Sequence, residues 1–109
     1  MDDCDEAYGV SLQGANIHEF IILNGGTTSE VDTTLDHSSG TDLTIEVRVS
    51  AAGVCTLFVD GAQVTSDTFA DFAGHTFDSG EQVYPAIHCV QGAIVTSVKE
   101  FECGLQRLR

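Results

Sequence analysis

The stretch from residue 42 to residue 64 has the clearest two-residue periodicity in the chain, and it restricts the possible folds more than any other feature. In its first half, apolar side chains alternate with polar ones, in the order Leu43, Thr44, Ile45, Glu46, Val47, Arg48, Val49, Ser50. Successive side chains of a β-strand point to opposite faces of the sheet. The alternation therefore predicts a strand with one apolar and one hydrated face.

A second apolar run, from Val54 to Val59, follows a short reversal at residues 51–53 and ends at Asp60-Gly61. Asp-Gly favours a tight hairpin, because both residues tolerate positive φ. If Ser50 lies opposite Val54, the two strands form three apolar pairs, namely Val49–Cys55, Val47–Leu57 and Ile45–Val59. We expect these pairs to share a buried face, since a slip of one residue would turn that face to water.

Further strand-like runs lie on both sides of this hairpin. We expect strands from Tyr8 to about Gly14, His18 to Leu23, Thr27 to Leu35, Ala62 to Thr65, Val83 to Val90 and Ala93 to Cys103. Asn24-Gly25-Gly26 predicts a hairpin turn between the second and third of these runs. Val31 and Leu35 are the expected core contacts of the strand after that turn.

Residues 66–80 form the longest stretch without alternation. We expect a crossover loop here, with one helical turn near Thr68–Ala73. Its phenylalanines are expected to close one end of the core, and they are Phe69, Phe72 and Phe77.

About eight strands at regular spacing, with almost no helical pattern, predict an all-β fold of the antiparallel β-sandwich or jelly-roll type. The length of 109 residues predicts a single domain over residues 1–109. Residues 1–7 are expected to be an acidic lead-in, and residues 104–109 an exposed tail.

The formal charge of −13 arises from 17 acidic residues against four basic ones. Such a field repels nucleic acid and anionic membrane surfaces, so we expect neither as a partner. The acidity is consistent with solubility, with docking onto a basic partner and with divalent-cation binding. No apolar run approaches the ~18 residues of a membrane span. The acidic beginning does not fit a signal peptide, so we expect no export signal in the chain itself.

The four cysteines, Cys4, Cys55, Cys89 and Cys103, allow three pairings and show no zinc-ligand spacing. Cys55 falls on the inward phase of its strand and is expected to be a small buried hydrophobe. If Gln91-Gly92 is a turn, Cys89 lies too far from Cys103 for a bridge. We expect mostly reduced cysteines, with a Cys4–Cys103 bridge as the open alternative.

No catalytic, cofactor-binding or metal-binding residue is assigned from the sequence, and we expect no enzyme activity. His88 and Cys89 are neighbours in a predicted strand and point to opposite faces, so they cannot form a nucleophile–base pair. Glu100 and Glu102 share a face and are expected to be solvated rather than catalytic. The acidic loop with Asp67, Asp71, Asp78 and Glu81 offers oxygen ligands for calcium, although its spacing matches no defined calcium loop.

The central hairpin also carries a family resemblance. Ile45-Glu46-Val47, a reversal with glycine, and Leu57-Phe58-Val59-Asp60-Gly61 together resemble two central strands of concanavalin A-like, laminin-G-like domains. Val83-Tyr84-Pro85-Ala86-Ile87 and the run from Val95 to Phe101 resemble later strands of that family. Asn24-Gly25-Gly26 and Val31-Asp32-Thr33 resemble versions on phage virion proteins. The chain is shorter than usual for such domains, which fits a minimal version, a fragment or a sandwich completed by a neighbouring chain.

The resemblance implies a non-enzymatic structural module, such as a phage capsid decoration subunit that contacts other virion or capsid subunits. We expect such a protein to assemble in the host cytoplasm and to be a homo-oligomer, or to have its sheet edge completed by a neighbour. No cofactor is implied. The alternative is an extracellular, lectin-like carbohydrate-binding module, with or without calcium. Its aromatic candidates, Tyr8, Tyr84 and Phe77, are expected to be core residues.

Overall fold

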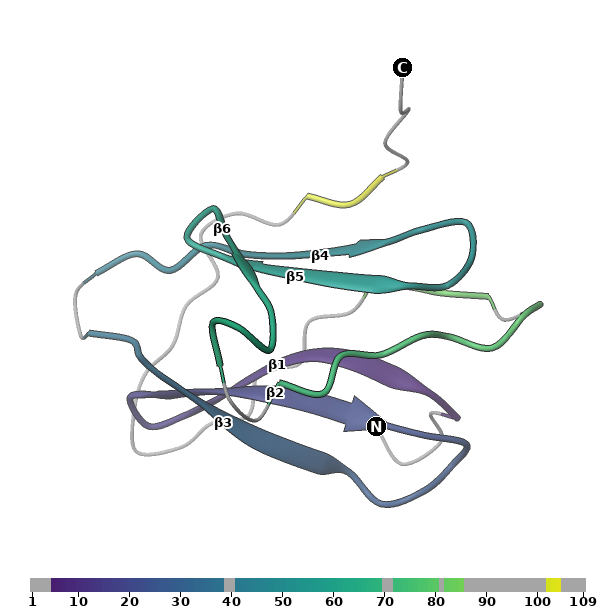
Figure 1. Cartoon of the computed structure of the whole chain (residues 1–109), viewed down its shortest axis with the longest axis horizontal. Coiled ribbons are helices and arrows are strands. Elements are labelled where there is room, and N and C mark those ends of the chain that lie inside the picture. Colours follow the sequence, from purple (N-terminus) through teal and green to yellow (C-terminus); the bar gives the residue numbers. More distant parts are fainter. Residues whose placement is uncertain (1–4, 39–40, 70–71, 81, 86–101, 105–109) are drawn as a thin grey trace.

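A computed structural model of the chain describes residues 5–38, 41–69, 72–80, 82–85 and 102–104. Over these residues the protein is all-β, without a helix, and contains two three-stranded antiparallel sheets (Figure 1). The predicted all-β class is confirmed. Six strands lie in this part of the chain, and none of its segments is an apolar helix of membrane-spanning length.

The first sheet has the order β1-β2-β3, with β1 at Ala7–Gln13, β2 at Asn16–Ile22 and β3 at Ser29–Asp36. The three predicted strands are confirmed, with ends shifted by one or two residues. The predicted turn after β2 is also confirmed, because Asn24 and Gly25 have φ of 46° and 64°.

A bulge interrupts the pairing of β2 with β3. Ile17 lies opposite Leu35, whereas the next residue, His18, lies opposite Asp32. The bulge turns Thr33 inward, where its hydroxyl donates a hydrogen bond of 2.6 Å to the Ile17 carbonyl. Leu35 packs against the core as expected. The buried residue of β3 is Thr33, however, and Val31 is only partly buried.

The second sheet has the order β4-β5-β6, with β4 at Ile45–Val49, β5 at Cys55–Val59 and β6 at Ala62–Val64. Its register is the predicted one, with Val49 opposite Cys55, Val47 opposite Leu57 and Ile45 opposite Val59. The Asp60-Gly61 hairpin is confirmed as well, because these residues have φ of 49° and 82°.

The expectation that all three pairs are buried is only half right. The β5 members, Cys55, Leu57 and Val59, are buried. The β4 members, Ile45, Val47 and Val49, are 38%, 38% and 39% exposed. The reason is topological, because β4 is an outer strand of its sheet within the part of the chain that the structure describes, and the core lies under β5 and β6.

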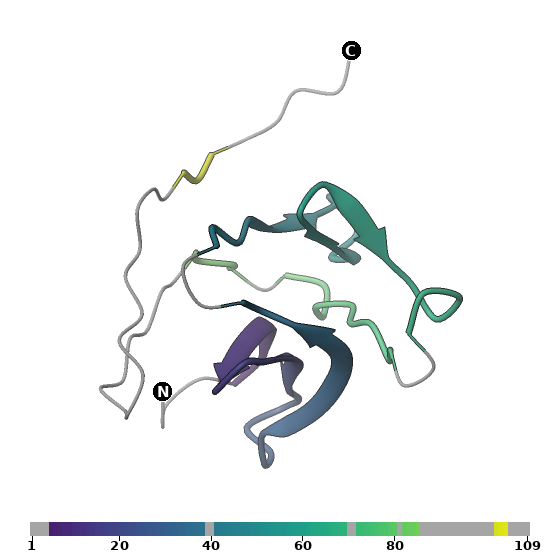
Figure 2. The same cartoon turned by 90° about the vertical axis from the view of Figure 1, so that its left-hand side faces the viewer.

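Both sheets contribute to one hydrophobic core. Ile17 of β2 packs with Leu57 and Val59 of β5, with Val64 of β6, and with Phe69. The sheets form two layers in Figure 1, and Figure 2 shows the segment that begins at residue 72 running between them.

The predicted crossover after β6 is confirmed in part. Phe69 and Phe72 reach the core as expected. Among the described residues of this stretch there is no helix at 68–73, and residues 70–71 lie outside them. A hydrogen-bonded turn occurs slightly earlier, where the Thr68 and Phe69 amides both donate to the Thr65 carbonyl at 2.9 Å.

The predictions for the last third of the chain fall mostly outside the described residues. Val83, Tyr84 and Pro85 are not in a strand, and Glu102 to Gly104 are not either. The rest of the two predicted strands, with the expected turn at Gln91-Gly92, lies at 86–101, outside the described residues.

The cysteine predictions have two outcomes. Cys55 is buried and free, as expected. Cys103 is exposed and also free, so the alternative Cys4–Cys103 bridge is wrong. Cys4 and Cys89 lie outside the described residues.

Two glycines with the same backbone conformation give the first testable prediction. Gly53 and Gly61 both have φ of 82°, but a Cβ at Gly53 would lie 2.4 Å from the Phe77 carbonyl oxygen, whereas one at Gly61 meets nothing within 4 Å. Gly61→Ala should therefore cost only the left-handed backbone strain of about 1–2 kcal/mol. Gly53→Ala should lower the free energy of unfolding further, by at least about 1 kcal/mol more, through steric overlap. Urea denaturation of both variants measures the difference, and equal losses would show that the close approach is unimportant.

Candidate functional site

An acidic side chain, Glu19, lies in the core of the protein. In β2 it has the same inward phase as Ile17 and Ile21, and it is 1% exposed. A buried carboxylate is costly unless hydrogen bonds replace its water, so its partners must come from the protein itself.

Three donors satisfy Glu19. The Tyr8 hydroxyl of β1 donates to Oε2 at 3.0 Å. The backbone amide of Ala73 donates to Oε1 at 3.0 Å, and that of Gly74 donates to Oε2 at 3.2 Å. One carboxylate thus connects the first sheet to the segment that follows the crossover turn.

His75 extends this polar cluster. Its ring stacks on Tyr8 with centroids 5.9 Å apart, and it meets the Phe77 ring edge-on at 4.8 Å. Its Nε2 lies 3.4 Å from Glu6 Oε2, and the two side chains are only 3% and 5% exposed. The distance is that of an ion pair, but Nε2 forms no hydrogen bond within the described part of the chain. The contact is therefore a close approach and not a directed hydrogen bond.

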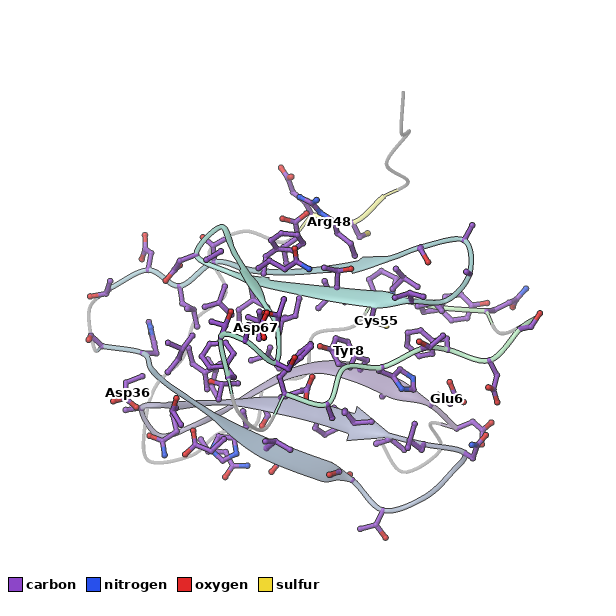
Figure 3. The ribbon with its side chains drawn as sticks, viewed as in Figure 1. Glu6, Tyr8, Asp36, Arg48, Cys55 and Asp67 are labelled. Atoms are coloured by element: carbon purple, nitrogen blue, oxygen red, sulfur yellow. The ribbon has the colours of Figure 1, made fainter. Side chains whose placement is uncertain are left out.

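The same segment is hydrogen-bonded to the second sheet. The Cys55 amide donates to the His75 carbonyl at 3.0 Å, and the Phe77 amide donates to the Gly53 carbonyl at 2.9 Å. Figure 3 shows Tyr8 and Cys55 in the space between the two layers. Residues 72–77, which we call the linking segment, therefore hold the two sheets together through hydrogen bonds on both sides.

Burial changes the acidity of two groups in this cluster. It raises the pKa of the Cys55 thiol to about 11, and the nearby negative charge of Glu6 adds to the effect. Burial also raises the pKa of Tyr8 above its usual range, and the charge and hydrogen bond of Glu19 act in the same direction. Both groups are therefore protonated at neutral pH, and Cys55 lacks the thiolate that a nucleophile requires.

An open groove of about 510 Å³ borders the linking segment. Its walls come from the end of β2, the start of β3 and the segment itself, and they are Ile21, Leu23, Ser29, Ala73, Gly74, His75 and Thr76. Among the described residues, no group of three His, Cys, Asp or Glu side chains could hold a metal ion.

Two of the four acidic-loop residues lie in the part of the chain that the structure describes. Asp67 and Asp78 are exposed, and Asp71 and Glu81 lie outside the described residues, so calcium binding there remains a prediction. Glu102 is exposed, whereas Glu100, His88 and Cys89 lie outside the described part.

The aromatic candidates have different outcomes. Tyr8 and Phe77 are partly buried in the cluster around His75, in line with their expected core position. Tyr84 is 76% exposed, so the expectation that it belongs to the core is wrong. Residues 82–85, which include Tyr84, are not in a strand.

Sequence reasoning missed Glu19, His75 and Glu6. A signal for Glu19 existed, because it alternates in phase with Ile17 and Ile21 and must share their face. No such signal existed for His75, since the linking segment has no periodicity.

The outer side of the second sheet carries a polar group of its own. Arg48 Nε lies 2.6 Å from Glu46 Oε1, and its guanidinium lies 4.3 Å from the centre of the Phe58 ring. The alternation places Glu46 and Arg48 on the face opposite to Ile45, Val47 and Val49. Residues 45–49, with this ion pair and the exposed apolar row, are hereafter the β4 edge.

A scan against protein-family models, a search of curated proteins and a search of solved structures each find no match to this chain. The concanavalin A-like resemblance therefore stays a prediction.

The polar groups around Glu19 and those of the β4 edge fall into two sets, an enclosed cluster that holds the fold together and an exposed strand that another molecule can contact. Glu19, Glu6 and His75 are almost completely enclosed, and their contacts hold β1, β2 and the linking segment in place. The β4 edge has both apolar and charged groups within reach of another molecule.

Removing the Glu19 carboxylate should destabilise the fold strongly. Glu19→Ala leaves the Tyr8 hydroxyl and the backbone amides of Ala73 and Gly74 without their acceptor, so we expect a loss of about 3 kcal/mol or more in the free energy of unfolding. Tyr8→Phe should cost about 1 kcal/mol, and the two losses should be non-additive because they share one hydrogen bond. Asp67→Ala, which removes an exposed acid, is the matched control, and it should change stability by less than about 0.5 kcal/mol. Urea denaturation of these three variants and of the Glu19→Ala/Tyr8→Phe double variant measures this, and a Glu19→Ala protein as stable as the control would contradict the role given to Glu19.

Proposed function

We propose that the chain is a concanavalin A-like β-sandwich of the jelly-roll type that serves as a non-enzymatic structural module. The particular role that we propose is a subunit of a phage particle, such as a capsid decoration protein. Support comes from the core that the two antiparallel sheets share and from the hairpin that resembles this family.

The observation that carries the proposal is the exposed apolar row of the β4 edge. In the part of the chain that the structure describes, β4 pairs with β5 on one side only. An outer strand with Ile45, Val47 and Val49 accessible offers both unpaired backbone groups and apolar surface. Such a combination is typical of a surface that another protein covers.

The buried polar cluster supports a structural rather than a catalytic role. The oxygens of Glu19 accept three hydrogen bonds, and the raised pKa of Cys55 keeps its thiol protonated. A general acid, base or nucleophile must reach a substrate, whereas these groups are engaged in contacts between the layers.

The charge of −13 supports a position on the outside of a particle. A strongly acidic subunit would be repelled by a packaged genome, and the same charge keeps an outward surface soluble.

Incorporation into particles tests this proposal. Quantitative mass spectrometry of purified particles should find the chain in a fixed ratio to the major capsid protein. Val47→Lys should reduce incorporation at least about tenfold, because it places a charge in the contact surface. Leu12→Lys is the matched control, since Leu12 is 37% exposed on the outer strand of the other sheet, and it should incorporate normally. Absence of the chain from the particles would refute the virion role.

One observation favours carbohydrate binding as a second candidate function. The Tyr84 ring is 76% exposed, and its hydroxyl donates a 2.8 Å hydrogen bond to Gln82 Oε1. An exposed aromatic ring with polar neighbours can pack on the apolar face of a sugar.

A glycan array, run with calcium and with EDTA, tests the second candidate. If it is right, a defined sugar should bind with a Kd of about 1 mM or better, and Tyr84→Ala should weaken that binding at least about tenfold. Calcium should strengthen it only if the acidic loop takes part. No binding, or binding that survives Tyr84→Ala, would count against this function.

A further inference from the structure

We propose that the β4 edge binds the β4 edge of a second copy of this chain. The two strands run antiparallel about a two-fold axis at Val47 and join two three-stranded sheets into one of six strands. This inference rests on the proposed use of the β4 edge as a protein contact, and it names the partner.

The backbone of β4 has the orientation that this pairing needs. The Thr44 carbonyl accepts from the Asp60 amide at 2.8 Å, and the Ser50 amide donates to the Val54 carbonyl at 2.9 Å. The even-numbered residues of β4 therefore direct their backbone groups toward β5. Because alternate residues of a strand direct these groups to opposite sides, Ile45, Val47 and Val49 direct theirs to the outer edge.

A two-fold axis at Val47 uses those outward groups. Val47 then lies opposite the partner's Val47 as a hydrogen-bonded pair, and Ile45 lies opposite the partner's Val49. The exposed apolar rows of the two copies become neighbours on the same face of the joined sheet. Each copy thereby covers the side chains that its own fold leaves 38–39% exposed.

The charges on the other face select this register. With the axis at Val47, Glu46 lies directly opposite the partner's Arg48, and Arg48 lies opposite the partner's Glu46. A shift by two residues in one direction would bring Glu46 opposite the partner's Glu46. A shift in the other direction would bring Arg48 opposite the partner's Arg48. Like charges directly across a strand pair are destabilising. The strand is therefore complementary to a second copy of itself in the register centred at Val47, and the two shifted registers are disfavoured.

The position of Arg48 in the sequence makes this complementarity specific. It is the only lysine or arginine before Lys99 in a chain of net charge −13, and it lies on the outer strand beside Glu46. The long-range field of two such chains is repulsive, so their association depends on contact and on screening. Salt should therefore strengthen self-association, whereas it would weaken docking onto a basic partner.

Sedimentation of the full chain over a range of concentrations tests the pairing. We expect a reversible monomer–dimer equilibrium whose Kd falls at least about threefold when salt rises from about 20 mM to about 500 mM. A protein that is monomeric under all these conditions, or a dimer that salt dissociates, would overturn the proposal.

Charge variants test the register. Glu46→Arg and Arg48→Glu each place like charges opposite one another, so each should weaken the dimer by about tenfold or more. A mixture of the two variants should restore a heterodimer of wild-type affinity. Each variant still has two like charges within its own strand, so only pairing between chains can explain such a rescue. Failure of the mixture to associate would overturn the register.

Two further variants keep the test independent of folding and of the virion role. Val47→Lys should abolish the dimer and Leu12→Lys should leave it intact, and thermal unfolding of each monitors the fold. Loss of the dimer in both variants, or in neither, would overturn the inference. A monomeric chain that still needs Val47 for incorporation refutes self-pairing but not the proposed function. A dimer that is absent from particles refutes the virion role but not the pairing.

Discussion

The hydrogen bonds to the Glu19 carboxylate are the interaction on which the arrangement of the two sheets depends. A buried carboxylate restricts the positions of the groups around it, because each oxygen needs hydrogen-bond donors from the protein in place of water. Tyr8 supplies one donor from β1, and the amides of Ala73 and Gly74 supply the others from the linking segment. The same segment is hydrogen-bonded to Gly53 and Cys55, so the hydrogen bonds of Glu19 also fix the position of the second sheet. Apolar packing alone would not fix this position so specifically.

The way in which the layers meet also explains the exposed strand. Ile17 and Phe69 pack against β5 and β6, and the linking segment reaches the second sheet at residues 53–55. The outer strand β4 lies beyond these contacts, and its apolar row is left partly open. The Glu19 carboxylate between the layers is hydrogen-bonded, whereas the apolar side chains of β4 remain partly exposed. An exposed apolar edge suits assembly with another chain rather than catalysis.

The predominance of acid gives the β4 edge its selectivity. In a chain of charge −13, most pairs of surfaces repel each other, and a patch with its own basic residue is an exception. The Arg48 side chain contacts the Glu46 carboxylate and the Phe58 ring, and these contacts fix the position of its charge on the strand. A neutral, self-complementary patch within a repulsive surface limits association to one geometry.

Local elements of the fold could be predicted from the amino-acid sequence. The register of β4 on β5 and the turns at Asn24-Gly25 and Asp60-Gly61 followed from period-two alternation and from residues that tolerate positive φ. The segments that cover each face of a strand could not be predicted in this way, because they depend on tertiary packing. Alternation shows that Ile45, Val47 and Val49 share a side, but their burial depends on segments distant in sequence. The same limit applies to the buried Glu19, whose backbone donors are more than fifty residues away. Periodicity reports which side chains lie together, and long-range packing decides what they meet.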